Sequence, residues 1–358
     1  MTKDTNDQDT MKAAVASNFG LPDDVLVVVE TRAKPSPSSD TDRLLIRVHA
    51  VSLSPSDYRT LLGQKTIVAN PSLPYIPGGD VSGVVQAPVP TSLQEEYKVG
   101  DRVMATWNIY GQGGLAQYTL VDPKYTIKLP TALTFVEGAA LANSAAHAYK
   151  ALELAGSVSG QRVLVLGGSG GVGSTIVQLL RNNGASYIAA TSTDETLLQE
   201  IAQVDRVIHY KRENWWQIAE FQQNPFDLVI DCAQGRQAWY KCGSVVKGKK
   251  DGGRWVAVIM QDWHIDGQHW YQLVSLLLPP LGRHLVNFAR RSTPEYRIYL
   301  ESIDASKMEP VVNMAANKEF KVVIDSRGPF PFTTQGVRDA FNLHIARGGH
   351  GKIVIEID

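Results

Sequence analysis

Cysteine is scarce in this sequence, because only Cys232 and Cys242 occur among its 358 residues. Two cysteines exclude a disulfide framework and favour a reducing compartment. The first ten residues, MTKDTNDQDT, lack both the apolar core of a signal peptide and the arginine-rich character of a transit peptide. We therefore expect a cytoplasmic protein.

Long hydrophobic runs and a large net charge of either sign are also missing. The longest apolar run, Leu273–Gly282, contains two prolines and is about half the length that spans a bilayer. We therefore expect no membrane span. Lys and Arg number 35 against 36 Asp and Glu, so no global field attracts nucleic acid or an anionic membrane. We therefore expect the protein to bind a small-molecule substrate and not to bind nucleic acid.

The pattern of the chain changes near residue 130. Short β-rich runs such as LLIRVHAVSL and VSGVV, separated by glycine and proline, fill the part from Met11 to about Leu129. After Pro130, runs of helix length alternate with short apolar strands, which is typical of βαβ units on a parallel sheet. The expected strands of this second part are Arg162–Leu166, Tyr187–Thr191, Arg206–His209, Leu228–Cys232 and Trp255–Ile259.

Strand-like segments return near the end of the chain. KVVID (321–325) and KIVIEI (352–357) flank a helical pattern around residues 336–346. We expect this tail to close back on the first domain. The sequence thus predicts an α/β protein with a β-rich domain (1–129 and 317–358) and an inserted Rossmann domain with a doubly wound parallel sheet (130–316).

A glycine-rich turn follows the first strand of the second domain, in RVLVLGGSGGVGSTIVQLLRNNGA. Gly168, Gly170 and Gly173 satisfy G-x-G-x-x-G, whose glycines allow a tight turn, close approach to a pyrophosphate and close helix packing. The following helix offers free N–H groups to an anion. Alone, the pattern also fits a flexible loop, but its strand and helix context favours a dinucleotide site. The expected phosphate-binding residues are Gly168, Ser169, Gly170, Gly171, Val172 and Gly173.

The next strand ends in three hydroxyl side chains, Thr191, Ser192 and Thr193. Asp194 and Glu195 follow, and NAD-specific sites use a carboxylate near this position to bind the ribose. Ser192-x-x-Glu195 also fits a capping box, and we favour helix capping over ribose binding. Hydroxyls without a carboxylate suit a 2′-phosphate, so NADPH is the expected cofactor. Further expected contacts follow the third strand, at Tyr210, Lys211 and Arg212.

Eight segments in order resemble the zinc-free quinone oxidoreductase and enoyl reductase branch of the medium-chain dehydrogenase/reductase superfamily. They cover nearly the whole chain, and their order and spacing are more specific than any one of them. The resemblance implies a GroES-like catalytic domain joined to the Rossmann domain, with the active site between them. The segments are SPSDYRTLLG (54–63), PGGDVSGVV (77–85), VGDRV (99–103), GGLAQYTLV (113–121), GGSGGVG (167–173), FDLVIDCAQG (226–235), GGRWVAVI (252–259) and GKIVIEI (351–357).

The zinc ligands of the metal-dependent relatives are replaced in this chain. Those relatives carry an early Cys, a Gly-His-Glu segment and a four-cysteine lobe, whereas this chain has Ser52, Gly79-Asp80 and no cysteine before residue 232. The resemblance therefore implies an enzyme without a metal. Hydride would pass from the nicotinamide while protein hydrogen bonds stabilise the oxyanion. That chemistry suits an enone, enal, enoyl thioester or quinone.

The resemblance also assigns roles within SPSDYRTLLG. Ser54 replaces an Asn that the family often has near the nicotinamide ribose, and Asp57 is expected to be structural. Tyr58 is a candidate acid or hydrogen-bond donor, and Arg59 a candidate contact for cofactor or substrate. In the alternative interpretation, Tyr58 is a packed ring and Arg59 an exposed charge, both on the surface of a helix.

His147 stands where the family usually has Thr, just before the Rossmann domain, and a histidine beside the nicotinamide could donate a proton. A structural or solvent-facing histidine is the favoured alternative. The segment QDWHIDGQHWYQL (261–273) is expected to pack at a cleft rim rather than bind metal, and it allows a homodimer. A second function from another class also remains: an NADPH-binding structural, sensor or scaffold protein without turnover.

Overall fold

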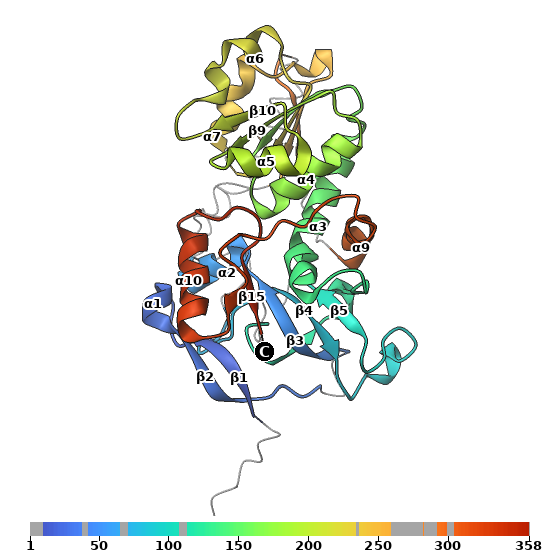
Figure 1. The fold of residues 1–358 in the computed structure, drawn as a ribbon, viewed down its shortest axis with the longest axis vertical. Coiled ribbons are helices and arrows are strands. Elements are labelled where there is room, and N and C mark those ends of the chain that lie inside the picture. The colour runs from blue at the N-terminus through green and yellow to red at the C-terminus, as the bar shows by residue number, and fades with distance from the viewer. Residues whose placement is uncertain are drawn as a thin grey trace, which may run out of the picture. The chain divides into compact units, whose positions relative to one another are not determined.

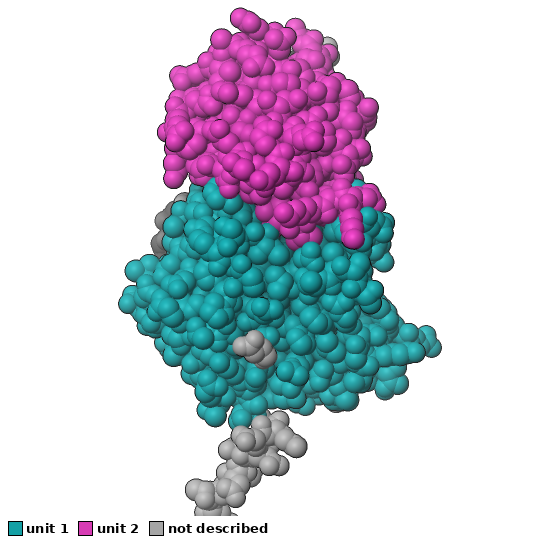
Figure 2. Space-filling view, in the orientation of Figure 1, with its two compact units in different colours: residues 1–146, 303–317, 324–358 teal, residues 147–302, 318–323 magenta. Residues whose placement is uncertain are grey.

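The computed structural model describes residues 10–37, 42–64, 71–106, 113–233, 236–258, 282, 292–298 and 304–357 (Figure 1). The chain divides into two compact units (Figure 2). Unit 1 comprises residues 1–146, 303–317 and 324–358, and unit 2 comprises residues 147–302 and 318–323. The chain passes from one unit to the other within helix α3 (Phe135–Ala155), whereas the sequence pattern changes earlier, near residue 130.

Unit 1 is rich in β-structure, as its alternating apolar runs predicted. A seven-stranded sheet has the order β14-β15-β3-β4-β5-β7, with β6 paired to β3, and a two-stranded sheet joins β1 to β2. The strands are β1 (Thr10–Ala16), β2 (Leu26–Ala33), β3 (Leu44–Ser52), β4 (Asp80–Val85), β5 (Arg102–Ala105), β6 (Tyr118–Val121), β7 (Thr126–Lys128), β14 (Phe330–Pro331) and β15 (Val354–Glu356).

Helices of unit 1 pack beside this sheet. Helix α10 contacts α1, α2, β2, β14 and β15, and so joins the C-terminal part of the chain to its N-terminal part. The helices are α1 (Pro22–Val25), α2 (Pro55–Leu61), η2 (Thr91–Leu93), η3 (Pro123–Tyr125), the first part of α3, α9 (Ala305–Ala316) and α10 (Thr334–Ile345).

The C-terminal tail closes on unit 1, because β15 pairs antiparallel with β3 and places Val354 opposite Ser52. The strand expected at residues 321–325 does not form and leaves only an isolated bridge between Ile324 and Lys352. The prediction was wrong because Gln178 of unit 2 bonds both the N–H and the carbonyl of Lys321. Those are the main-chain groups that a strand neighbour would use.

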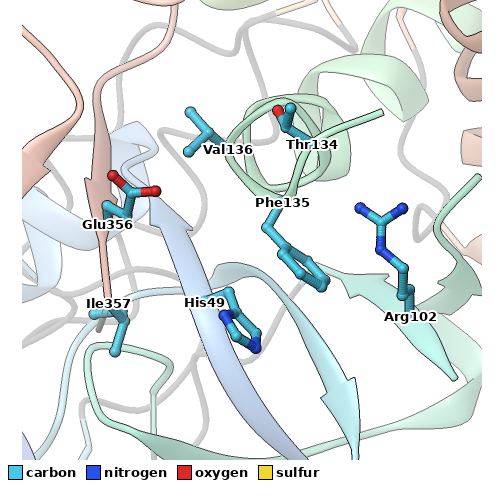
Figure 3. Close-up of a pocket in the computed structure, with 7 residues that line it drawn as sticks. All are labelled: His49, Arg102, Thr134, Phe135, Val136, Glu356 and Ile357. Carbon is cyan, nitrogen blue, oxygen red and sulfur yellow. The ribbon is translucent and has the colours of Figure 1, made fainter. Parts of the chain in front are cut away.

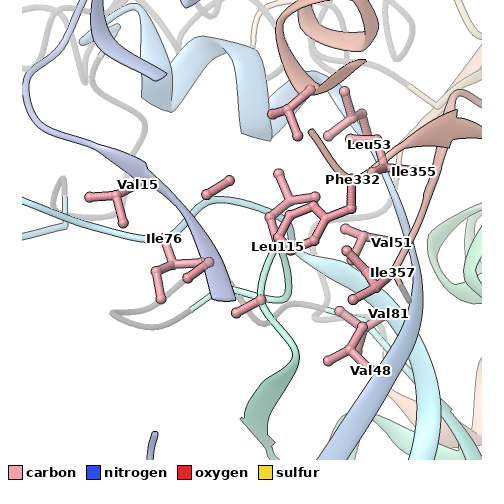
Figure 4. Packing of buried hydrophobic residues seen from close by; sticks show 14 of the residues in the cluster. Val15, Val48, Val51, Leu53, Ile76, Val81, Leu115, Phe332, Ile355 and Ile357 are labelled. Atoms are coloured by element: carbon pink, nitrogen blue, oxygen red, sulfur yellow. The ribbon is translucent and has the colours of Figure 1, made fainter. Parts of the chain in front are cut away.

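One hydrophobic cluster forms the core of unit 1 (Figure 4). Side chains from β1, β3 and β15 meet there, for example Val15, Val51 and Ile355, together with Leu115 and Phe332. Each of these five side chains is at most 8% exposed. Leu44, Ile46 and Val48 of β3 belong to this cluster, whereas Arg47 is exposed, as the two-residue period of a strand requires.

Unit 2 is a parallel sheet with the strand order β10-β9-β8-β11-β12-β13. Its order reverses at β8, which is the doubly wound arrangement that the sequence predicted. Helices α4 and α5 pack against β8, β9 and β10. The strands are β8 (Arg162–Leu166), β9 (Tyr187–Ser192), β10 (Arg206–His209), β11 (Leu228–Asp231), β12 (Arg254–Ala257) and β13 (Glu295–Ile298).

The core of unit 2 is unusually aromatic. Trp215, Phe221, Phe226, Trp255 and Tyr296 are each at most 2% exposed and belong to one cluster. The helices of the unit, with α4 and α5 included, are the second part of α3, α4 (Gly171–Asn182), α5 (Glu195–Ala202), η4 (Trp215–Gln217), α6 (Ala219–Gln223), α7 (Arg236–Lys241), η5 (Cys242–Ser244) and η6 (Lys249–Asp251).

Candidate functional site

The glycine turn of unit 2 lies between β8 and α4, as the sequence predicted. The packing of the protein requires Gly167, Gly168 and Gly173 for different reasons, but it does not require Gly170. A Cβ on Gly173 would lie 2.0 Å from the carbonyl oxygen of Gly167, and a Cβ on Gly168 would lie 2.7 Å from the Cβ of Ala190. Gly167 has a φ of +84°, in the left-handed region that favours glycine. Gly170 has room for a Cβ within the protein, since its nearest neighbour would be 3.5 Å away.

The N-terminus of α4 has the features of an anion site. Gly170 is its N-cap residue, and no side chain caps this end. The N–H groups of the first helical turn, on Gly171, Val172 and Gly173, therefore have no intrahelical acceptor. Twelve residues of aligned peptide dipoles add a partial positive charge there. The turn thus fits a pyrophosphate, which its N–H groups would hold.

Two of the three hydroxyl residues at the end of β9 are buried and bond the backbone nearby, Thr191 at the glycine turn and Ser192 at the start of α5. Thr191 is 1% exposed, its Oγ1 accepts the N–H of Gly167 at 2.7 Å, and its carbonyl accepts the N–H of Gly168 at 3.0 Å. Ser192 is fully buried, and its Oγ accepts the N–H of Asp194 at 2.8 Å. Only Thr193 of the three is half-buried rather than buried. These two buried hydroxyls stabilise the backbone of the site.

The capping residue of α5 differs from the sequence prediction. Asp194, not Ser192, is the N-cap, and its Oδ1 accepts the N–H of Leu197 at 3.0 Å. The Ser192-x-x-Glu195 capping box was wrong because α5 begins two residues later than that pattern requires, at Glu195. The carboxylate of Asp194 is nevertheless engaged in helix capping, as expected. Glu195 is exposed in the first turn, where the helix dipole favours a negative charge.

Basic side chains follow β10 at the same edge of the sheet. Tyr210 is 42% exposed, and Lys211 and Arg212 are exposed and form no ion pair with any described residue. Arg206 is different, because its guanidinium bonds both carboxylate oxygens of Glu213. Lys211 and Arg212 are therefore the cations at this edge that remain available to an anionic ligand.

Helix α2 of unit 1 carries Ser54, Tyr58 and Arg59. Its start is fixed by Asp57, which is 3% exposed and accepts the N–H and Oγ–H of Ser54 at 2.7 and 2.9 Å and the N–H of Gly79 at 3.0 Å. Burial, together with the nearby charge of Asp80, raises the pKa of Asp57 to about 6. Asp57 thus holds the start of α2 to the loop before β4, and Ser54 is 5% exposed at that point.

The ring of Tyr58 packs against the hydrophobic core of unit 1. It meets His344 of α10 edge to face, with ring centroids 5.1 Å apart, and the Arg59 guanidinium lies 5.9 Å from its centroid. Burial and the charge of Lys352 lower the pKa of His344 to about 4, so this imidazole is neutral at pH 7. Tyr58 and Arg59 are both half-buried.

The candidate residues are divided between the two units. Unit 1 holds Ser54, Tyr58 and Arg59, and unit 2 holds His147, which is half-buried on α3. Unit 2 also contains every expected cofactor residue except Ser54, and the glycine turn, the end of β9 and the end of β10 lie at one edge of its parallel sheet. The segment 261–273, expected at a cleft rim, lies outside the described residues.

Unit 1 also has a shallow hollow of about 430 Å³. Figure 3 shows the Phe135 ring between His49 and Arg102 there. The ring centroids of Phe135 and His49 are 4.3 Å apart, and the Arg102 guanidinium lies 4.5 Å from the Phe135 centroid. Arg102 also donates to the carbonyl of Leu133 at 2.6 Å. None of the candidate residues lines this hollow, whose rings and charges already contact one another.

Comparison with known proteins agrees with this arrangement. Residues 40–131 match the alcohol dehydrogenase GroES-like domain, and residues 202–355 match the zinc-binding dehydrogenase family. The chain is 34% identical to 2-methylene-furan-3-one reductase of Solanum lycopersicum, over 89% of this chain and 73% of that protein. It is 32% identical to the chloroplastic NADPH-dependent alkenal/one oxidoreductase of Arabidopsis thaliana, over 99% and 82%. The solved quinone oxidoreductase of Coxiella burnetii has the same fold, with a TM-score of 0.78 and 23% identity over 97% of this chain and 99% of that one.

A doubly wound sheet with a glycine turn at its reversal point, together with a GroES-like β-rich unit, defines an oxidoreductase fold of the medium-chain type. The chain belongs to the medium-chain dehydrogenase/reductase superfamily, in its quinone oxidoreductase branch. Within the described ranges, no helix is long and apolar enough to cross a membrane.

The matched family is named for zinc, but the residues of this chain at the expected positions of the zinc ligands do not suit a zinc ion. Asp80 accepts the Thr106 hydroxyl at 2.7 Å and the Lys352 ammonium at 3.2 Å, and the Oγ of Ser52 donates to the carbonyl of Ala139 at 2.7 Å. Lys352 also donates to the carbonyl of Leu53. A buried ammonium beside Asp80 repels a dication, and neither an imidazole nor a thiolate stands at these positions.

Proposed function

We propose that this protein is an NADPH-dependent reductase of conjugated carbonyl compounds or quinones. The observation that carries the proposal is the glycine turn at the start of α4, whose backbone fits a pyrophosphate. It lies next to an edge where Lys211 and Arg212 form no ion pair with any described residue. Relatives with 32–34% identity bear the names of an alkenal/one oxidoreductase and a methylene-furanone reductase, which supports a carbon–carbon double bond next to a carbonyl.

The coenzyme preference rests on the ends of β9 and β10. A 2′-phosphate needs cations and hydroxyls, and Lys211, Arg212 and Thr193 offer them. A ribose 2′-hydroxyl needs a carboxylate, but the carboxylate of Asp194 caps α5. We therefore propose Thr193, Tyr210 and Lys211 as 2′-phosphate contacts, while Thr191 supports the glycine turn and Ser192 supports the start of α5.

When bound, the coenzyme supplies the hydride. The protein must then stabilise the negative charge on the carbonyl oxygen of the substrate and deliver a proton to the α carbon. We propose Tyr58, Arg59 and His147 as the donors for these two tasks. Ser54, held at the start of α2 by Asp57, is the proposed contact to the nicotinamide ribose.

We propose that this chemistry uses no zinc. A metal ion here would need Asp80 as a ligand, but the buried ammonium of Lys352 already pairs with that carboxylate. Hydrogen-bond donors of the protein would then carry the whole stabilisation of the oxyanion. Loss of one such preorganised donor typically lowers kcat by about 10²- to 10³-fold.

Binding and turnover of the purified protein test the proposal. Fluorescence titration should show NADPH binding at least about tenfold tighter than NADH, equivalent to about 1.4 kcal/mol. A panel of enones, enals and quinones should then give steady NADPH consumption. Equal affinities for the two coenzymes would refute the coenzyme assignment, and binding without turnover on the panel would favour a structural or sensor role.

The setting of the protein is part of the proposal. We propose a reducing compartment such as the cytoplasm, which suits the two free cysteines, Cys232 and Cys242. Burial raises the pKa of both, so neither is a reactive thiolate. We also propose a homodimer. Light scattering coupled to gel filtration tests the dimer, and a mass near that of one chain would refute it.

A further inference from the structure

His209 stands at the edge of unit 2 where the proposed 2′-phosphate contacts meet, and the sequence interpretation assigned it no role. It is the last residue of β10 and pairs with Ser192, the last residue of β9. Because the two strands are parallel, both residues lie at the carboxyl edge of the sheet, where doubly wound proteins bind their ligands. Tyr210 and Lys211 follow His209 directly in the chain.

The two ring nitrogens of His209 have different surroundings. Nδ1 is buried and has no hydrogen-bond partner among the described residues, while the side chain as a whole is only half-buried. A buried N–H without an acceptor is more costly than a bare lone pair, so the neutral ring carries its proton on Nε2. Nε2 is not among the buried atoms without a partner and bonds none of the described residues, so it is accessible and can donate to a ligand.

Three of the neighbouring carboxylates are engaged with other groups. Asp194 caps α5, Glu213 is paired with Arg206, and Asp205 is paired with Arg181 at 2.8 Å. Glu195 is exposed in the first turn of α5. Lys211 and Arg212 have no ion-pair partner among the described residues. The edge thus presents an imidazole donor and two cations, a set that fits a phosphate dianion rather than a ribose hydroxyl.

We propose that His209 donates from Nε2 to the 2′-phosphate and is a residue that determines the preference for NADPH over NADH. This inference rests on the proposed NADPH dependence and adds a residue to it. Lys211 and Arg212 supply charge, whereas His209, at the end of a sheet strand, supplies a donor with a fixed direction. The adenosine and pyrophosphate parts of the coenzyme do not depend on it.

The test uses the fragments 2′,5′-ADP and 5′-AMP, whose affinities for the full chain are measured by isothermal titration calorimetry. His209→Phe keeps the ring and removes both nitrogens, and His209→Gln restores an N–H near the position of Nε2. His209→Asn is a second loss variant, because its shorter amide reaches only the position of Nδ1. Thermal melts of all variants check that they fold.

A hydrogen bond to a charged group predicts that His209→Phe and His209→Asn bind 2′,5′-ADP about tenfold or more weakly, with 5′-AMP binding unchanged. His209→Gln should retain most of the affinity for 2′,5′-ADP. If the wild type prefers 2′,5′-ADP and both loss variants keep that preference, the role of His209 is refuted while NADPH dependence stands. If 5′-AMP binding falls in parallel, His209 is merely structural. If the wild type shows no preference, both proposals fail.

Discussion

The ammonium of Lys352 lies 3.2 Å from Oδ2 of Asp80, and both side chains are almost fully buried, at 9% and 2% exposed. Asp57 is a second buried carboxylate close enough for each charge to affect the other. Lys352 is thus the cation that compensates two acids in the interior of unit 1.

Lys352→Met should therefore destabilise the protein by about 3–5 kcal/mol, because it leaves buried carboxylates without a counter-ion. Chemical denaturation measures the change. The control is Lys128→Met, which removes the exposed partner of Asp101 and should cost less than about 1 kcal/mol. Equal effects of the two substitutions would contradict the compensating role of Lys352.

Substitutions in the glycine turn should distinguish an effect on folding from an effect on coenzyme binding. Gly173→Ala should disrupt the turn, since its Cβ would lie 2.0 Å from a carbonyl oxygen. Gly170→Ala has space in the protein and should fold normally, but its methyl group should weaken NADPH binding by about tenfold or more, where the backbone approaches the pyrophosphate. Gly243→Ala meets nothing within 4 Å and is the control. Unchanged NADPH affinity in Gly170→Ala would argue against a phosphate at this turn.

The stability of the protein should depend on pH through His344. Its pKa falls from 6.5 when unfolded to about 4 when folded, so the unfolded chain binds more protons between pH 4 and 6.5. Wild-type stability should therefore rise with pH across this window, relative to His344→Phe, by up to about 1.4 kcal/mol per pH unit. Phe keeps the edge contact to Tyr58. Parallel pH profiles for the two proteins would rule out a lowered pKa.

The titration of Asp57 should change the stability of the protein in the opposite direction to that of His344 in part of this pH range. Its pKa is raised from 3.8 to about 6, so the folded state binds the extra proton and wild-type stability falls as pH rises through this range. Asp57→Asn removes the titration, and the wild type should lose stability relative to this variant between pH 4 and 6. Urea denaturation at several pH values measures both slopes, and a wild type that instead gains relative to Asp57→Asn would contradict the raised pKa.

Catalysis should depend on at least one of Tyr58, Arg59 and His147. A group that stabilises the oxyanion or supplies the proton should cost about 100-fold in kcat when removed, with NADPH affinity nearly intact. We rank Tyr58 first. If Tyr58→Phe, Arg59→Ala and His147→Ala each retain most of their turnover on enones, side-chain acid catalysis is absent and the rate comes from positioning of the coenzyme.

The metal content gives an independent check. The purified protein should contain no stoichiometric zinc, and chelators should leave activity and thermal stability unchanged. Elemental analysis measures this directly. One zinc per chain, lost together with activity, would overturn the proposal.

Five of the six strands of the parallel sheet and the glycine turn could be predicted because they depend on local signals, whereas β13 (Glu295–Ile298) was not expected. β8 is an apolar run next to a glycine motif, and the structure places it within the residues expected. The start of α5 could not be predicted, since Asp194 and Ser192 are both good capping residues and only the bond to Leu197 decides between them. The lost strand at 321–325 depends on Gln178, which is 143 residues away in the chain.

The role of His209 could not be predicted for a similar reason. The sequence shows a histidine at the end of a strand, which is compatible with any surface position. Only the pairing with Ser192 and the missing partner of Nδ1 distinguish it. The buried pair Asp80–Lys352 likewise joins residues that are 272 positions apart, and no local pattern predicts it.

Thr191 has a practical consequence for changing the coenzyme of this protein. Its hydroxyl and carbonyl accept the N–H groups of Gly167 and Gly168, so replacing the hydroxyl by a carboxylate would remove one support of the turn that we propose as the coenzyme site. Redesign toward NADH therefore has to leave Thr191 in place. It should introduce the acidic side chain at the half-buried Thr193 and neutralise Lys211 and Arg212, where the backbone of the turn is not disturbed.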